Sequence, residues 1–242
     1  MGSTLLIYCS IIFAATFGVG LLTLVRKWED EPLHLFVSFG AGIFMGVVFF
    51  HMLPEAFNTQ AAGAIPVMLL AGFLLVFFVE KFLLTTGDGG VVHEHKAIAV
   101  TALIGLTVHS IIEGFGLTIA SSDSHFIDLF FYSILSHKIP AAISLASLFL
   151  LARLTKKQVV LLLLVFSLAT PLGALFSFPF FAQSGPVYIA YLTALTAGSL
   201  LYIATGELLP EVFHTRSQRW LKLGLFLAGL LLITVLAPSH SH

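Results

Sequence analysis

Two histidines and a glutamate lie in neighbouring apolar stretches of the sequence, at a spacing suited to holding a metal ion. His109 and Glu113 are four residues apart, so on a helix they share one face. His137 supplies a third ligand-type side chain from the next stretch, and water, Ser110 or Ser136 could complete a shell of four or five ligands. Imidazole nitrogen and carboxylate oxygen suit a borderline divalent ion such as zinc, whereas copper(I) would require sulfur ligands.

The composition places these residues inside a membrane protein. Of 242 residues, 58% are hydrophobic and 10% are charged, and the mean hydropathy is +1.04, whereas a soluble domain carries about 25% charged residues. A formal net charge of −1 argues against nucleic-acid binding. The single cysteine, Cys9, excludes an intrachain disulfide framework and a cysteine-based metal cluster.

Eight apolar stretches are each long enough to cross a bilayer, which takes about 20 residues. They cover residues 3–25, 33–57, 65–85, 97–120, 127–152, 158–180, 186–214 and 219–237, with short connections. We therefore expect an all-α integral membrane protein, built as a single polytopic domain over residues 1–242 and embedded in the lipid bilayer. The alternative for the His/Glu set is that neighbouring helices simply satisfy it, but ionisable groups at matched depth in lipid favour a binding site.

The basic residues predict the orientation of the chain. All of the eleven lysines and arginines except Lys138 flank connections on the same side of the eight spans. The positive-inside rule makes that side cytoplasmic and places both termini outside. We expect a multi-pass protein of the cell membrane, with Lys138 left inside a span beside His137.

Further ionisable side chains lie towards both ends of the spans and predict a polar path. Those near the outer face are His51 and Glu55, with Asp123, His125 and Asp128 in the outer connection. Those near the inner face are Glu207, Glu211 and His214. Ionisable residues spaced in this way between the two faces are typical of a transport path, although the residues of the outer connection are better explained by solvation than by metal collection.

One five-residue motif occurs twice. Leu-Pro-Glu-x-Phe stands at residues 53–57 and again at 209–213. Because the first span runs outward and the second runs inward, the copies are expected at opposite faces, as in an inverted-repeat transporter with its site near the midplane. Each Pro-Glu pair could equally mark an interfacial helix end, and the sequence leaves both interpretations open.

Two motifs resemble a known family. The run His-Ser-Ile-Ile-Glu-Gly-Phe-Gly from His109 resembles the signature of the ZIP (Zrt- and Irt-like) metal-ion transporters, and His-Lys-Ile-Pro from His137 resembles its partner motif. The resemblance covers nearly the whole chain. It implies uptake of a divalent metal ion into the cytoplasm as transported substrate, with zinc the first candidate and iron, manganese or cadmium as alternatives. It implies no catalytic cofactor, and it leaves a homodimer open.

The resemblance also assigns the site. His109, Glu113 and His137 match the primary metal site. At a second metal site, Ser110 stands where Asn is frequent, Lys138 where Asp or Glu is frequent, Ala141 where a glutamate bridges, and Thr170 where an acidic residue is found. With an ammonium and no carboxylate there, we predict a single-metal centre. Lys138 either replaces the charge of the second metal or is simply a lysine held by Glu113 or a helix carbonyl.

Two other classes of protein share some of these features. A membrane-embedded zinc-dependent hydrolase would also hold His and Glu ligands, but it needs an open metal position and a general base, and the sequence has no His-Glu-x-x-His run. A cation channel would share the polar path, but its rate of ion conduction should not saturate at low metal concentration. We expect a secondary transporter and not an enzyme.

Other polar residues receive structural interpretations. His34 is expected at an interfacial helix start, Glu80 and Lys81 as an ion pair at the membrane boundary, and His95 in a solvated loop. Glycines of the 97–120 stretch, including Gly114, predict close packing of that helix against the 127–152 helix.

Overall fold

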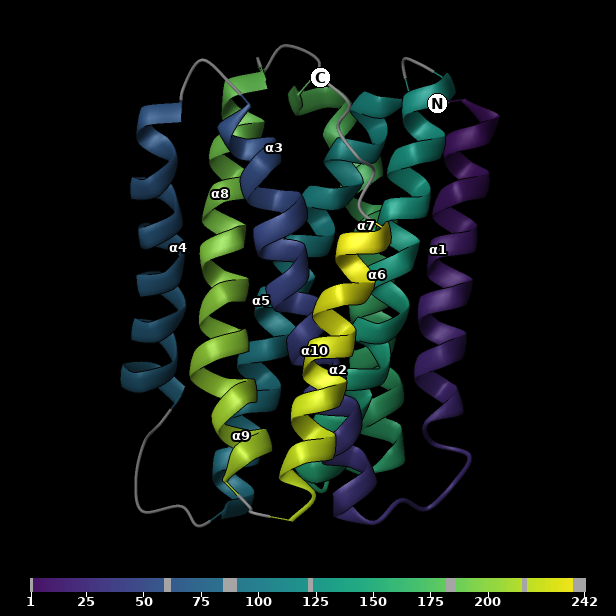
Figure 1. Cartoon of the computed structure of the whole chain (residues 1–242). Helices are drawn as coiled ribbons and strands as arrows, with labels where there is room; N and C mark the ends of the chain where they lie inside the picture. The colour runs from purple at the N-terminus through teal and green to yellow at the C-terminus, as the bar shows by residue number, and fades with distance from the viewer. Residues whose placement is uncertain are drawn as a thin grey trace.

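The computed structural model describes residues 2–58, 62–84, 91–121, 124–181, 186–214 and 217–236, and the regular structure of these residues is entirely helical. Seven helices in this part of the chain are long and apolar enough to cross a membrane. They stand side by side in one bundle (Figure 1). The expected all-α membrane fold is confirmed.

Four of the long helices are continuous. They are α1 (Ser3–Leu22), α5 (Val91–Ala120), α6 (Ser124–Leu151) and α7 (Lys156–Phe181). Helix α6 continues through Pro140 although proline cannot donate a hydrogen bond to the preceding turn. Helix α5 begins before Lys96, so His95 belongs to a helix and the loop expected for it is wrong.

Three further segments are composite. Helix α2 (Asp30–Val47) leads through the π-helix η1 (Val48–Met52) into α3 (Leu53–Phe57), and α8 (Pro186–Tyr202) leads through the π-helix η4 (Ile203–Leu208) into α9 (Leu209–Phe213). The short η2 (Ala62–Ala64) precedes α4 (Ile65–Phe78), which ends in the π-helix η3 (Val79–Leu84). The predicted stretch 219–237 corresponds to α10 (Arg219–Leu236), which packs on α2.

The two Leu-Pro-Glu-x-Phe motifs fold alike. Each forms a five-residue helix, α3 or α9, directly after a π-helix. Pro54 and Pro210 occupy the second position of these helices, and each removes one donor from the preceding turn, a common setting for a π-bulge. Helices α3 and α9 lie at opposite ends of the bundle (Figure 1).

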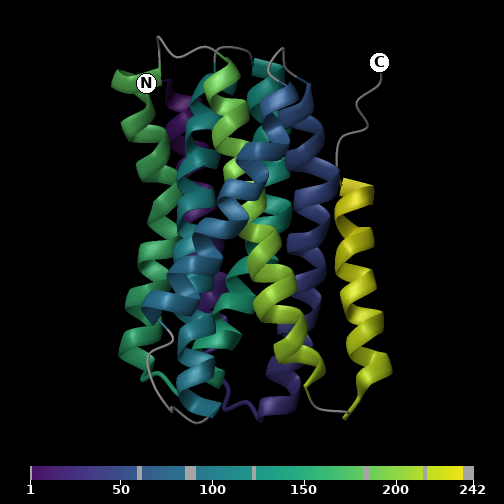
Figure 2. The same ribbon diagram turned by 90° about the vertical axis from the view of Figure 1, so that its left-hand side faces the viewer.

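The two ends of the bundle differ in charge. Helix α1 ends and α10 begins at the lower end in Figure 1, which we call the basic end because Arg153, Lys156 and Arg219 lie at helix termini there. The opposite end carries α3 and the start of α1. Figure 2 shows α10, in yellow, at one edge of the bundle beside α2.

Close backbone contacts hold helices together in pairs. A Cβ atom added to Gly114 of α5 would lie 2.3 Å from the carbonyl oxygen of Thr170 on α7, and one added to Gly173 of α7 would lie 2.2 Å from that of Ile111. Helix α5 therefore packs most closely against α7 through Gly114, and the expectation that this glycine faces the 127–152 helix is wrong. Glycines make similar close approaches between α4 and α8 and between α2 and α10.

The distribution of polar and apolar side chains is that of a membrane protein. Large apolar residues such as Leu70, Leu75 and Phe176 are exposed on the outside of the bundle, as expected for surfaces that face lipid. Ionisable side chains are buried in its interior, Glu113 and Lys138 among them. Since such groups are costly in a bilayer unless they are paired or functional, the interior contacts of these residues show where a site lies.

Candidate metal centre

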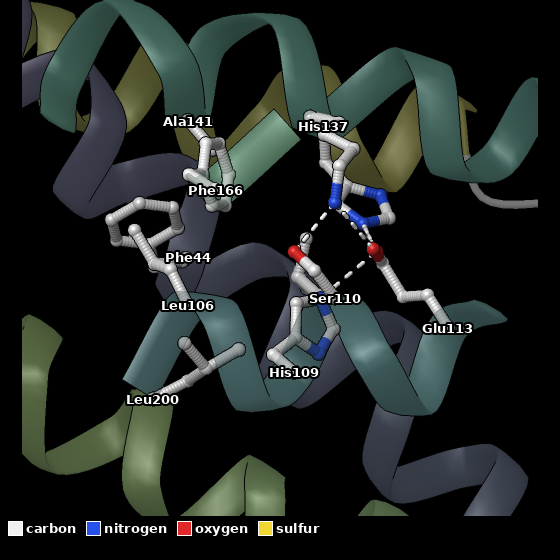
Figure 3. A pocket seen from close by; sticks show the side chains of 11 residues that line it. Phe44, Leu106, His109, Ser110, Glu113, His137, Ala141, Phe166 and Leu200 are labelled. Atoms are coloured by element: carbon white, nitrogen blue, oxygen red, sulfur yellow. Dashed lines mark hydrogen bonds and ion pairs between the residues drawn. The ribbon is translucent and has the colours of Figure 1, made fainter. Parts of the chain in front are cut away.

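The centre forms where α5 and α6 face each other. His109 and Glu113 lie one turn apart on α5, with Nε2 of His109 3.0 Å from Oε1 of Glu113. The Nε2 atom of His137 on α6 forms a hydrogen bond with the same carboxylate oxygen (Figure 3). The potential ligand atoms of the three side chains lie within 4.8 Å of one another, and all three side chains are buried. The structure thus brings together the three residues expected from their spacing.

The ring nitrogens of His109 are buried beside a carboxylate. Among the residues that the structure describes, His109 makes no well-aligned hydrogen bond through either ring nitrogen, although Nε2 is near Glu113. A buried polar atom without a partner is rare and calls for an explanation such as a bound ion. Two imidazoles and one carboxylate whose ligand atoms lie within 4.8 Å of one another are a donor set that suits a divalent ion.

Lys138 neutralises the other side of the carboxylate. Its Nζ atom donates hydrogen bonds to Oγ of Ser110, at 2.5 Å, and to Oε2 of Glu113, at 3.0 Å. The ammonium also lies 4.8 Å from the centre of the Phe166 ring, in cation–π contact. The hydroxyl of Thr170 is 3.4 Å from Oε2 of Glu113. One carboxylate oxygen therefore faces the histidines, and the other faces an ammonium and a hydroxyl.

A pocket leads from this centre towards the end of the bundle that carries α3. It is lined by both centre histidines and Glu113, and further along by His51 and Glu55. The His51 and His137 rings lie 6.2 Å apart, and His51 also contacts the hydroxyl of Ser133. The structure thus places the expected outer residues His51 and Glu55 along an approach to the centre. Asp123 and the side chain of His125 lie outside the described residues.

A second, mostly apolar pocket adjoins the centre, and Ser110 and Lys138 are also part of its lining. Buried Phe44, Leu106, Phe166 and Leu200 line it, together with Ala141 (Figure 3). Leu106 precedes His109 on α5, which begins at the basic end, so this side of the centre lies towards that end. An ion could therefore approach from the α3 end along ionisable side chains, whereas the pocket on the other side is lined mostly by apolar ones.

A second group of histidines gathers around Glu211 at the basic end. Oε1 of Glu211 lies 2.9 Å from Nε2 of His34 on α2 and 2.8 Å from Nε2 of His95 on α5. The His214 ring lies 5.5 Å from that of His34, and a ligand atom of His214 is within 4.8 Å of those of His34 and Glu211. We call His34, His95, Glu211 and His214 the basic-end cluster.

Sequence reasoning found only half of this cluster. Glu211 and His214 were expected on the path, whereas His34 and His95 were expected to be an interfacial residue and a solvated one. His34 is buried against Glu211, and His95 is half-buried against the same carboxylate. No short motif links these residues, so the only available signal is the presence of ionisable residues near helix ends on the basic side.

Glu207 lies apart from the cluster, although it was expected on the same path. It is buried in η4 and interacts with Glu80 and Tyr202. Tyr202 donates a hydrogen bond of 2.5 Å to Glu80, and Lys81 donates another of 2.5 Å to the same residue. The expected ion pair of Glu80 and Lys81 is present, and Glu207 belongs to this network between α4 and α8.

Comparison with known proteins decides the family. The model of the ZIP zinc transporter family matches residues 85–237, which make up more than half of the chain and include the residues of α5 and α6 that form the metal centre. The chain belongs to the ZIP zinc transporter family. Members of this family are transporters and not enzymes, so the hydrolase alternative is not favoured. The family and the apolar helices together make this chain a multi-pass membrane protein.

Several curated relatives share this family. Zinc transporter ZIP9 of Micropogonias undulatus is 31% identical over 176 residues, which cover 65% of this chain and 54% of that protein. Zinc transporter ZIP1 of Bos taurus is 27% identical over 254 residues, covering 85% and 78%. Zinc transporter ZIP9-B of Xenopus laevis is 26% identical over 289 residues, covering 92% and 93%. The match thus spans about half of the first relative and most of the other two.

Proposed function

We propose that this ZIP-family chain carries zinc across the membrane into the cytoplasm, one ion at a time, through His109, Glu113 and His137. The observation that carries the proposal is the convergence of these three buried side chains, whose ligand atoms lie within 4.8 Å of one another. Zinc is favoured because two imidazoles and a carboxylate match its preferences and because the curated relatives are named zinc transporters. Iron, manganese and cadmium remain the alternative substrates.

The direction follows from the charged ends of the bundle. The basic end is cytoplasmic by the positive-inside rule. The pocket with His51 and Glu55 then opens to the outside, and the basic-end cluster faces the cytoplasm. An ion enters past His51 and Glu55, exchanges water for His109, Glu113 and His137, and leaves through the basic-end cluster. Because the side chains on the inner side of the centre are mostly apolar, passage of the ion requires a rearrangement, as in alternating access.

The centre holds one ion because the ammonium of Lys138 already lies where a second ion would bind. Lys138 is 3.0 Å from Glu113, and Ala141 and Thr170 offer no carboxylate to a second ion. A second dication beside an ammonium would be repelled and would lack ligands. Lys138 therefore supplies the positive charge that compensates Glu113 while leaving its other oxygen for zinc.

Reconstitution tests the function. Purified protein in liposomes that contain a fluorescent zinc indicator should give zinc entry that saturates with external zinc, because each ion must occupy the centre. Entry that rises linearly without saturating would favour a channel. Protein that binds zinc at equilibrium but admits none would contradict the proposed transport.

A further inference from the structure

A buried lysine stands beside the basic-end cluster. Lys222 of α10 is 1% exposed, and its Nζ atom donates a hydrogen bond of 2.9 Å to the carbonyl oxygen of Val212, the residue that follows Glu211. Its own carbonyl accepts a hydrogen bond of 2.7 Å from Ser38 of α2. The lysine is thus fixed from both sides, with its ammonium at the end of α9.

The ammonium acts electrostatically on the cluster. Lys222 interacts attractively with Glu211 and repulsively with a protonated His34. It also attracts Glu31, but Glu31 is exposed and bound by Ser217 and Gln218. Charges separated by buried protein are weakly screened, whereas exposed ones are strongly screened, so the ammonium acts on the buried cluster as well as on Glu31.

The arrangement repeats what occurs at the midplane. Lys138 and Lys222 are the two lysines that are buried in the described part of the chain, each 1% exposed. Lys138 lies against the carboxylate of the midplane centre, and Lys222 bonds the backbone of the residue that follows the glutamate of the basic-end cluster. Lysine is almost never fully buried unless it is paired. Lysine side chains often donate hydrogen bonds to the last carbonyl oxygens of a helix. An exposed lysine can do this without the cost of burying its charge, so this bond alone does not explain why Lys222 is buried.

We propose that Lys222 is a fixed counter-charge that weakens metal binding at the basic-end cluster and so speeds release of the ion to the cytoplasm. Two imidazoles and one carboxylate, those of His34, His214 and Glu211, would otherwise form a good zinc site. A transport path must bind its ion favourably enough to admit it and weakly enough to let it leave. Lys222 makes no contact with the ion in this scheme and acts through Glu211, as a positioning residue. The inference rests on the proposed function.

The first test measures binding without transport. In a Glu113→Gln background, which disables the midplane centre, zinc binding to the purified full chain is measured by equilibrium dialysis. Adding Lys222→Gln, which keeps a hydrogen-bond donor but no charge, should tighten zinc binding about tenfold. Lys222→Arg should leave the affinity unchanged because it keeps the charge. Lys222→Met, which keeps the length of the side chain, should behave as Lys222→Gln does and guards against a packing defect.

Two comparisons show whether the effect runs through the cluster. Lys156→Gln is the matched control, since Lys156 also bonds a backbone carbonyl at the basic end, at 3.3 Å from Leu24, but lies at the start of α7. It should not change zinc affinity. Adding Glu211→Gln should abolish the tightening caused by Lys222→Gln, because the charge of Lys222 acts through that carboxylate in the proposed scheme, and the effects of coupled residues are not additive. Equal affinities for the Lys222→Gln and Lys156→Gln proteins, or tightening that persists without Glu211, would overturn the proposal.

The second test uses uptake kinetics in the otherwise unaltered chain. Slower release should lower kcat and KM together by up to about tenfold and leave kcat/KM unchanged, because loading from outside is not affected. A merely structural defect would lower kcat/KM, and that result would count against the proposal. Failure of the wild-type chain to take up zinc would instead contradict the proposed function, and it would leave the binding comparison of Lys222 variants intact.

Discussion

We expect Glu113→Gln to abolish zinc uptake and to weaken zinc binding at the midplane by about 100-fold or more. The carboxylate accepts contacts from His109, His137, Lys138 and Thr170 at once. Glutamine keeps the size of the side chain but removes the charge, so a dication would face the Lys138 ammonium with no compensating anion. Breaking a buried charge pair costs about 3–5 kcal/mol, and about 1.4 kcal/mol is tenfold in affinity.

Equilibrium zinc binding and uptake into liposomes measure this effect. Glu31→Gln is the matched control, because it removes an exposed carboxylate at the basic end, and it should bind and transport zinc at nearly the wild-type level. The thermal unfolding midpoint separates loss of the site from loss of the fold. A folded Glu113→Gln protein that binds zinc at the midplane as tightly as the wild type would refute the ligand assignment.

We expect Lys138→Asp to change the number of zinc ions bound at the midplane from one to two. The substitution replaces an ammonium 3.0 Å from Glu113 with a second carboxylate. Two carboxylates and two histidines can then share two divalent ions, where the wild-type centre repels the second. We expect this change because Lys138 sits on the oxygen of Glu113 that faces away from the histidines.

The number of zinc ions bound per chain is measured after equilibration with zinc, for the wild-type and Lys138→Asp proteins. Both proteins carry Glu211→Gln for this measurement, so that the basic-end cluster does not contribute. Lys138→Met should still bind one ion at the midplane, since it removes the charge without adding a ligand. One zinc per chain in the Lys138→Asp protein would show that the ammonium does not stand in for a second metal.

The midplane centre was predictable because its residues follow from local geometry. Residues four apart on a helix share a face whatever the rest of the fold does, so His109 and Glu113 had to converge. A third ionisable side chain, His137, lies in the next span, and few arrangements of these two neighbouring spans would leave it exposed to lipid. The cost of exposing it there made the inward orientation of the two helices predictable as well.

The basic-end cluster was not predictable, because it depends on how helices are rotated about their axes. His34 lies near the start of α2 and His95 near the start of α5, and apolar spans with little periodicity do not reveal which residue faces which neighbour. For the same reason Gly114 was expected against the wrong helix, since α5 is lined with small residues on more than one side. Glu207 shares its span with Glu211, but four residues in the η4 and α9 segment, which combines π- and α-helical turns, do not keep the two on one face.

The repeated Leu-Pro-Glu-x-Phe motif was informative for a physical reason. Proline cannot donate a backbone hydrogen bond, and in both copies it stands at the second position of the short helix that follows a π-helix. The structure shows a π-helix at each place, η1 and η4, at opposite ends of the bundle. The same local chemistry thus leads to His51 and Glu55 at one end and to Glu211 and His214 at the other.

Zinc uptake by wild-type and His137→Ala proteins, measured side by side in liposomes, tests the central claim most directly. His137 joins α6 to the carboxylate of α5, so its loss should remove saturable zinc entry while the protein stays folded. Ser147→Ala of the same helix, whose hydroxyl bonds to the carbonyl of Ile143, should transport normally. Saturable entry in the His137→Ala protein at the wild-type rate would contradict transport through the midplane centre.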